Sequence, residues 1–194
     1  MDYELSASTF APTAKVHLQR GEKLRIEPGA MVYQLGDIEL EGHMNTNGKK
    51  GLGGALSALG RSVTSGESFF ISTATARSNE AMIAIAPAVP GKIFALDVGA
   101  EHWRLNTGAF LASEENVSYQ MQRQKLSGAL LGGTGGLFVM ETTGRGQILV
   151  SAFGDVEKIE LDGHSPVIID NQHVIAWTNS LDYNIRVASG TFGF

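Results

Sequence analysis

Short stretches in which apolar and polar residues alternate recur along this chain, with turn-forming residues such as Gly21, Gly91 and Gly146 between them. Alternation with a period of two places one face of a strand against a core and the other face in water. Many short strands separated by turns are typical of an all-β sandwich or barrel-like fold. The alternating stretches contain Val16 and Leu18, Leu24 and Ile26, Phe69 and Ile71, Ile93 and Ala95, Ile148 and Val150, Ile159 and Leu161, and Ile185 and Val187.

One block of these strands occurs three times, over residues 15–32, 93–111 and 158–175. Each copy contains a strand, a glycine turn, a second strand, a tight turn and a third apolar strand. Similarity at a spacing of this size indicates that one supersecondary unit has been copied along the chain.

A second block occurs only twice, over residues 51–71 and 128–140, where a glycine-rich apolar loop leads into a strand that contains phenylalanine. From Gly108 to Gly135 is 27 residues, and the same offset from Gln172 reaches position 199, beyond the 194 residues of this sequence. Two repeats are therefore complete and the third is half present.

These blocks predict one compact unit that is built from three repeats. Repeat one spans 1–92, repeat two spans 93–155, and the partial repeat three spans 156–194. A partial repeat leaves a strand edge without its neighbour, and exposed edges invite pairing with another chain.

Charge and composition exclude several classes of protein. The chain has 15 Lys and Arg against 20 Asp and Glu, and neither half is basic, so it lacks the positive stripe of a typical nucleic-acid binder. It has no cysteine, which excludes disulfides and thiolate chemistry. The longest apolar stretch, 81–91, contains two prolines and is far shorter than the roughly 20 residues of a membrane span. The start of the chain is acidic, unlike a signal peptide, so we expect a soluble, cytoplasmic protein.

Residues that could carry chemistry occur without a catalytic or ligand pattern. Ser65 lacks the first glycine of a nucleophile elbow, and the glycine-rich loops lack the lysine position of a phosphate-binding loop. The carboxylate pairs Glu114-Glu115, and Glu157 with Glu160, lie in polar stretches and are expected to be exposed. We therefore predict no enzymatic activity, no cofactor and no metal. The histidines, none of which has metal-ligand spacing, are His17, His43, His102, His164 and His173.

The glycine-rich loops are the candidate functional segments, because they are apolar whereas ordinary surface loops are polar. Such loops pack under the fold, enter an oligomer interface, or contact a membrane or ligand. The basic residues that flank the first loop suit anionic headgroups. The residues concerned are Lys49, Lys50, Leu52, Leu56, Leu59 and Arg61 in the first loop, and Leu130 and Leu131 in the second.

A polar-aromatic stretch follows the apolar residues 109–111. Val117, Tyr119 and Met121 alternate with polar residues and predict another strand. Arg123 and Lys125 at its end favour a solvated edge over a binding site.

In the order and spacing of these blocks, the sequence resembles the family formerly called domain of unknown function 124, which has bacterial members and relatives among fungal mitochondrial biogenesis proteins. The resemblance spans essentially the whole chain. It implies a bacterial protein with a β-rich fold similar to the tryptophan RNA-binding attenuator protein, with tandem copies around a pseudo-threefold axis. Family members usually continue with two further strands, which would complete repeat three. The matching stretches are residues 25–32, 51–61, 64–70 and 174–177.

The resemblance implies no catalytic residues, and a fold by itself carries neither tryptophan nor RNA binding. Our leading hypothesis is a non-enzymatic scaffold or assembly protein that associates with itself, because repeat-built bodies often close against copies of themselves. The alternative is a binding module for an apolar or anionic small molecule or lipid, through the glycine-rich loops. Nucleic-acid binding by analogy with the attenuator fold, and an enzyme with residues converging from different repeats, are the remaining options.

Overall fold

The structure is a computed structural model that describes residues 1–46, 68–106, 108–123 and 138–185. Strands make up nearly all of the regular structure in these ranges, so the all-β fold predicted from the alternating residues is confirmed. One 3-10 helix covers Asn171–His173. The strands are β1 (Asp2–Leu5), β2 (Ala14–Leu18), β3 (Lys23–Ile26), β4 (Met31–Leu35), β5 (Ile38–Thr46), β6 (Ser68–Ala76), β7 (Ala81–Ile85), β8 (Gly91–Val98), β9 (Trp103–Asn106), β10 (Phe110–Glu114), β11 (Val117–Arg123), β12 (Phe138–Gly144), β13 (Gly146–Phe153) and β14 (Ala176–Thr178).

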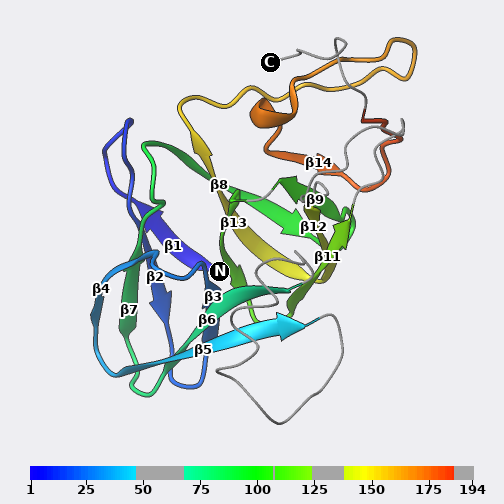
Figure 1. Ribbon diagram of the computed structural model, residues 1–194. Helices are drawn as coiled ribbons and strands as arrows, with labels where there is room; N and C mark the ends of the chain where they lie inside the picture. Colours follow the sequence, from blue (N-terminus) through cyan, green and yellow to red (C-terminus); the bar gives the residue numbers. More distant parts are fainter. Residues whose placement is uncertain (47–67, 107, 124–137, 186–194) are drawn as a thin grey trace.

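The described strands form three antiparallel sheets, whose arrangement is visible in Figure 1. The first has the order β1-β2-β7-β4. The second, with six strands, has the order β5-β6-β3-β10-β13-β8. The third has the order β11-β12-β9-β14. The stretch around Tyr119 and Met121 thus forms the predicted strand, as β11.

Two successive groups of six strands pair in the same pattern. In the first group, β7 lies between β2 and β4, and β6 lies between β3 and β5. In the second group, β13 lies between β8 and β10, and β12 lies between β9 and β11. The register of β4 shifts between Met31 and Tyr33, and that of β10 shifts between Phe110 and Ala112. The first two copies of the sequence block therefore share their strand pairing down to this irregularity.

The groups are joined through another recurring contact. β3 pairs with β10, with Ile26 opposite Ala112. β9 pairs with β14 in the corresponding register, with Leu105 opposite Ala176. In both joints, the second strand of one copy receives the third strand of the next copy. β4 is the third strand of the first copy, and it ends its sheet with no described strand on its outer side.

The core consists of two clusters of buried side chains that meet at β13. Leu149 belongs to the cluster that the first sheet shares with the second, and Ile148 belongs to the cluster shared with the third sheet. Both side chains are completely buried. Because consecutive residues of a strand point to opposite faces, β13 is covered on both faces.

The third copy departs from the predicted strands. Residues 155–170 contain no strand, so the strands expected around Ile159 and Leu161 and over Val167–Ile169 are wrong, and Ile185 also lies outside any strand. The physical reason is a missing neighbour. The counterparts of Ile159 lie in β2 and β8, which pair with β7 and β13, and no described strand takes that place beside Ile159. Alternation supplies a face to bury, but a strand also needs partners for its N–H and C=O groups.

Candidate functional site

A tight turn with the same backbone hydrogen bond occurs once in each of the three copies, after β3, after β9 and after residues 167–169. The N–H of Ala30 donates to the carbonyl of Glu27 at 3.1 Å, and the N–H of Ala109 donates to that of Asn106 at 3.1 Å. The N–H of His173 donates to the carbonyl of Asp170 at 2.9 Å. The first two turns change the sheet to which the chain belongs, from β3 in the second sheet to β4 in the first, and from β9 in the third sheet to β10 in the second. The turns are therefore corners, and a polar side chain begins each of them.

A cavity of about 170 Å³ lies beside the first two corners. Its walls are mostly apolar side chains from four strands, and Glu27 and Asn106 supply the polar groups. In the sequence, Phe70 follows Gly66 of the first glycine-rich block by four positions, and Met121 precedes Gly128 of the second block by seven. The lining residues are Glu27, Pro28, Phe70, Asn106, Gly108, Phe110, Met121 and Met140.

Glu27 is the ionisable group of this cavity. Burial raises the pKa of its carboxyl above the ordinary value. Within the described part of the chain, no lysine, arginine or histidine forms an ion pair with it. A half-buried carboxylate without a cation favours neutral or cationic occupants of the cavity and disfavours anions.

Replacing Glu27 with glutamine should make the protein more stable at neutral pH. Because burial raises this pKa in the folded protein, the folded state favours the protonated carboxyl, and stability decreases as pH rises through the unfolded-state pKa and then the raised one. Glutamine is uncharged, so the variant should melt at a higher temperature than the wild type at about pH 7 and at the same temperature at about pH 3. Thermal melts at the two pH values measure this. Glu101→Gln, at an exposed position, is the control, and an equal gain for Glu27→Gln at both pH values would contradict the account.

A second recurring arrangement involves an arginine, a backbone carbonyl and a tyrosine. The guanidinium of Arg25 donates to the carbonyl of Val117, and its charge acts on the nearby Tyr119. Arg104 donates to the carbonyl of Leu181 at 3.2 Å and lies 5.3 Å from the ring centre of Tyr183. Burial raises the pKa of both tyrosines, so neither phenol ionises near neutral pH. These groups hold one copy against the next and show no pairing of an acid with a base for catalysis.

The glycine-rich loops and their flanking charges lie outside the described residues. This applies to every predicted site residue, and Lys125 lies there as well. The residues are Lys49, Lys50, Leu52, Leu56, Leu59, Arg61, Leu130 and Leu131.

Glu114 is the carboxylate that differs most from its predicted surroundings. We expected it to be solvated, but it is only 32% exposed and forms an ion pair with the amino group of Met1. It also accepts a hydrogen bond of 2.7 Å from the N–H of Gln147. Glu115 is exposed and pairs with Lys23 at 2.9 Å. The N-terminal strand therefore reaches the middle of the second sheet, which the local sequence around Glu114 did not indicate.

The other chemical groups stay apart in the described ranges. No group of three or more His, Asp or Glu side chains that could hold a metal ion occurs there. In the same ranges, no helix has the length and apolar character needed to cross a membrane.

Sequence reasoning missed the cavity and its carboxylate. A signal existed, since Glu27, Asn106 and Asp170 occupy the same place in the three aligned copies. The alignment shows that a polar residue recurs at this position. It does not show that Glu27 is partly buried beside a cavity, which is what makes this residue a candidate site.

The structure defines an all-β protein in which three antiparallel sheets pack around apolar clusters and border a small open cavity at their corners. Its sequence matches the mitochondrial biogenesis AIM24 family over residues 3–194. The chain belongs to this family. An uncharacterised protein of Streptococcus pyogenes serotype M6 is 42% identical over 190 residues, covering 98% of this chain and 75% of that protein.

The fold is also similar to an experimental structure. The crystal structure of a Streptococcus pyogenes protein matches this chain with a TM-score of 0.77 and 39% sequence identity. The match covers 98% of this chain and 82% of the crystallised one.

Proposed function

We propose that this protein is a non-enzymatic scaffold that associates with itself through its β framework. The proposal includes a pseudo-threefold arrangement similar to that of the tryptophan RNA-binding attenuator protein, and a cytoplasmic location. The observation that carries it is the outer edge of β4. Two of three equivalent edges, those of β10 and β14, are covered by a neighbouring strand, whereas no strand of the described residues lies beside the edge of β4.

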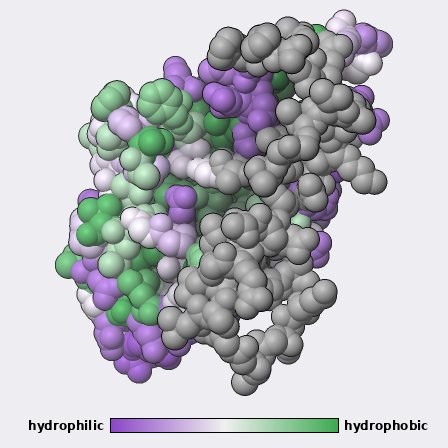
Figure 2. All heavy atoms as spheres, in the orientation of Figure 1, coloured by the Kyte–Doolittle hydropathy of each residue, from purple (hydrophilic) through white to green (hydrophobic). Residues whose placement is uncertain are grey.

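The open edge also bears apolar side chains. Val32, Tyr33 and Leu35 are exposed, although a strand with this composition is typical of a protein interior. Figure 2 shows hydrophobic residues on the left-hand side of the molecule, over the region where β4 runs in Figure 1. Unpaired N–H and C=O groups beside exposed apolar side chains form a template for another strand.

Light scattering across a range of protein concentrations tests the proposal. We expect the mass to rise from 20.7 kDa toward a multiple of it as the concentration reaches about micromolar. A mass that stays at the monomer value well above micromolar concentration would reject a self-associating scaffold.

The second candidate function is binding of a small apolar molecule in the cavity beside Glu27. It is supported by the phenylalanine and methionine walls and by the position of Phe70 and Met121 near the glycine-rich segments. A small neutral apolar molecule such as benzene should bind, because a cavity of this volume takes a ligand of about that size, and Met121→Trp should abolish this binding by filling the cavity. Val89→Trp, at an exposed position, is the matched control. Equal benzene binding by both variants would exclude the cavity as the site.

A further inference from the structure

We propose that two copies of this chain exchange one strand reciprocally: residues Val167–Ile169 of each copy pair antiparallel with the outer edge of β4 in the other. The register places Val167 opposite Leu35, Ile168 opposite Gln34 and Ile169 opposite Tyr33. This inference rests on the proposed self-association and names the surface and the segment that produce it.

The register follows from the two edges that are already covered. On β10, Ala112, Ser113 and Glu114 lie opposite Ile26, Arg25 and Leu24. On β14, Ala176, Trp177 and Thr178 lie opposite Leu105, Arg104 and Trp103. The aligned copies make β4 the counterpart of β10 and β14, and they make Val167–Ile169 the counterpart of β3 and β9.

Backbone hydrogen bonds at the corners fix the same alignment independently. The N–H of Glu27 donates to the carbonyl of Leu111 at 2.9 Å, and the N–H of Asn106 donates to that of Ile175 at 2.9 Å. The third bond of this set would run from the N–H of Asp170 to the carbonyl of Val32. The corner that begins at Asp170 already has the same internal hydrogen bond as the other two.

Both segments of the proposed contact, β4 and residues 167–169, are more exposed to solvent than their counterparts in the covered joint. In the covered joint, Leu111 and Ala112 are completely buried, whereas their counterparts Val32 and Tyr33 are 55% and 41% exposed. Ile26 is buried in β3, whereas its counterpart Ile169 is 46% exposed. Two complementary apolar surfaces in one chain therefore face water, and joining them removes both from it.

The proposed contact between β4 and residues 167–169, the open joint, differs from the two covered joints in a pair of side chains. At each covered joint an arginine lies beside a tyrosine, Arg25 beside Tyr119 and Arg104 beside Tyr183. The same two positions at the open joint hold Ile168 and Leu40, which are 74% and 39% exposed. An apolar pair thus replaces a polar pair on two segments that are far apart in the sequence, which fits direct contact between them.

At the open joint, the corresponding backbone carbonyl accepts its hydrogen bond from a side chain of its own copy. Arg25 and Arg104 donate to the carbonyls of Val117 and Leu181. At the open joint, the amide of Gln34 donates to the equivalent carbonyl of Ile38 at 3.1 Å. The carbonyl therefore needs no arginine from the incoming segment, which leaves the position of Ile168 available to an apolar residue.

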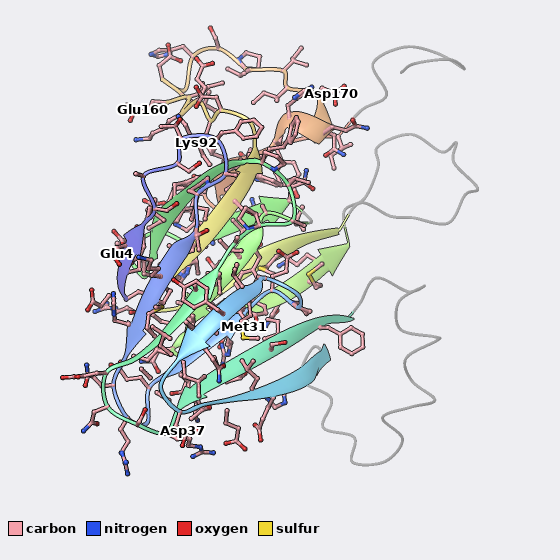
Figure 3. All side chains as sticks on the ribbon, turned by 90° about the vertical axis from the view of Figure 1, so that its left-hand side faces the viewer. Glu4, Met31, Asp37, Lys92, Glu160 and Asp170 are labelled. Carbon is pink, nitrogen blue, oxygen red and sulfur yellow. The ribbon has the colours of Figure 1, made fainter. Side chains whose placement is uncertain are left out.

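A second copy of the chain supplies the strand that pairs with β4, because residues 167–169 of the same chain lie in another part of the molecule. Figure 3 looks onto β4, where Met31 is labelled, and Asp170 and Glu160 lie toward the top of the view. Figure 1 shows the same vertical separation between β4 and the segment before β14. Each copy carries both an edge of β4 without a described neighbour and an exposed segment 167–169, so a reciprocal exchange closes a two-fold dimer in which both β4 edges are covered.

Paired cysteines test the contact, since the chain has no cysteine of its own. Leu35→Cys and Val167→Cys are placed in separate chains, which are then mixed under mild oxidation. At the proposed register, the two residues form a non-hydrogen-bonded antiparallel pair with Cα atoms about 4.5 Å apart, within the range of a disulfide. We expect a cross-linked dimer of the two chains. Leu35→Cys mixed with Ile168→Cys is the control, because that neighbouring residue faces the opposite side of the strand.

Each outcome decides a different question. A cross-link for Leu35→Cys with Val167→Cys and little for the control supports the exchange. A wild-type dimer by light scattering without that cross-link rejects this interface while leaving self-association intact. A strict monomer rejects both. A disulfide within one chain that carries both substitutions, with no dimer in the mixture, shows that the chain closes on itself and overturns the exchange.

Discussion

Replacing Leu149 with alanine should lower the free energy of unfolding by about 2–5 kcal/mol, because it removes a large side chain from a site that collapses poorly. Leu149 is completely buried in the cluster between the first and second sheets. Its strand, β13, pairs with β10 on one side and with β8 on the other. The cavity left by the substitution would lie where neighbouring strands hold the backbone on both sides.

Urea denaturation measures this loss, and Val89→Ala is the matched control. Val89 is 48% exposed, so its truncation should change the unfolding free energy by less than about 0.5 kcal/mol. Comparable losses for the two variants would show that β13 does not form the centre of the core.

Replacing Gly144 with alanine should destabilise the protein by about 2–4 kcal/mol, for two separate reasons. The backbone of Gly144 has a φ of +85°, which side chains other than glycine rarely adopt. An added Cβ would also lie 2.2 Å from the carbonyl oxygen of Asn116, so the turn that joins β12 to β13 would have to shift.

Gly29→Ala separates the two causes. Gly29 has nearly the same φ, +84°, but an added Cβ would meet open space. Its substitution should cost only the backbone strain, about 1–2 kcal/mol. Denaturant unfolding of both variants measures the difference, and a cost at Gly29 as large as that at Gly144 would contradict the steric part of this account.

The strands of the first two copies could be predicted because their alternation coincides with available partners. Val16 and Leu18 alternate in β2, where both side chains are buried and the strand pairs with β7. Ile159 and Leu161 alternate just as clearly, yet they are 49% and 44% exposed and form no strand. Periodicity records which face a strand would bury, whereas pairing depends on a second segment elsewhere in the chain.

The cavity could not be predicted for a related reason. Glu27 and Asn106 are 79 positions apart in the sequence, and only the corners of two different sheets bring them to one cavity. The same limit applies to Glu114, whose partner is the amino group of Met1. The sequence indicated which positions recur, but the environment of each position depends on which neighbouring copy covers it.

Hydrogen exchange along β4 tests the central claim most directly, namely that β4 is the uncovered member of three equivalent edges and takes a strand from a second copy. The amides of Gln34, Ile168 and Asp170, which form the hydrogen bonds of the proposed register, should exchange quickly in dilute solution and become protected as the concentration rises. The control is Ser113, the counterpart of Gln34, whose edge is already covered and whose protection should not depend on concentration. If the mass doubles while Gln34 and Ile168 exchange equally fast at both concentrations, the claim is contradicted.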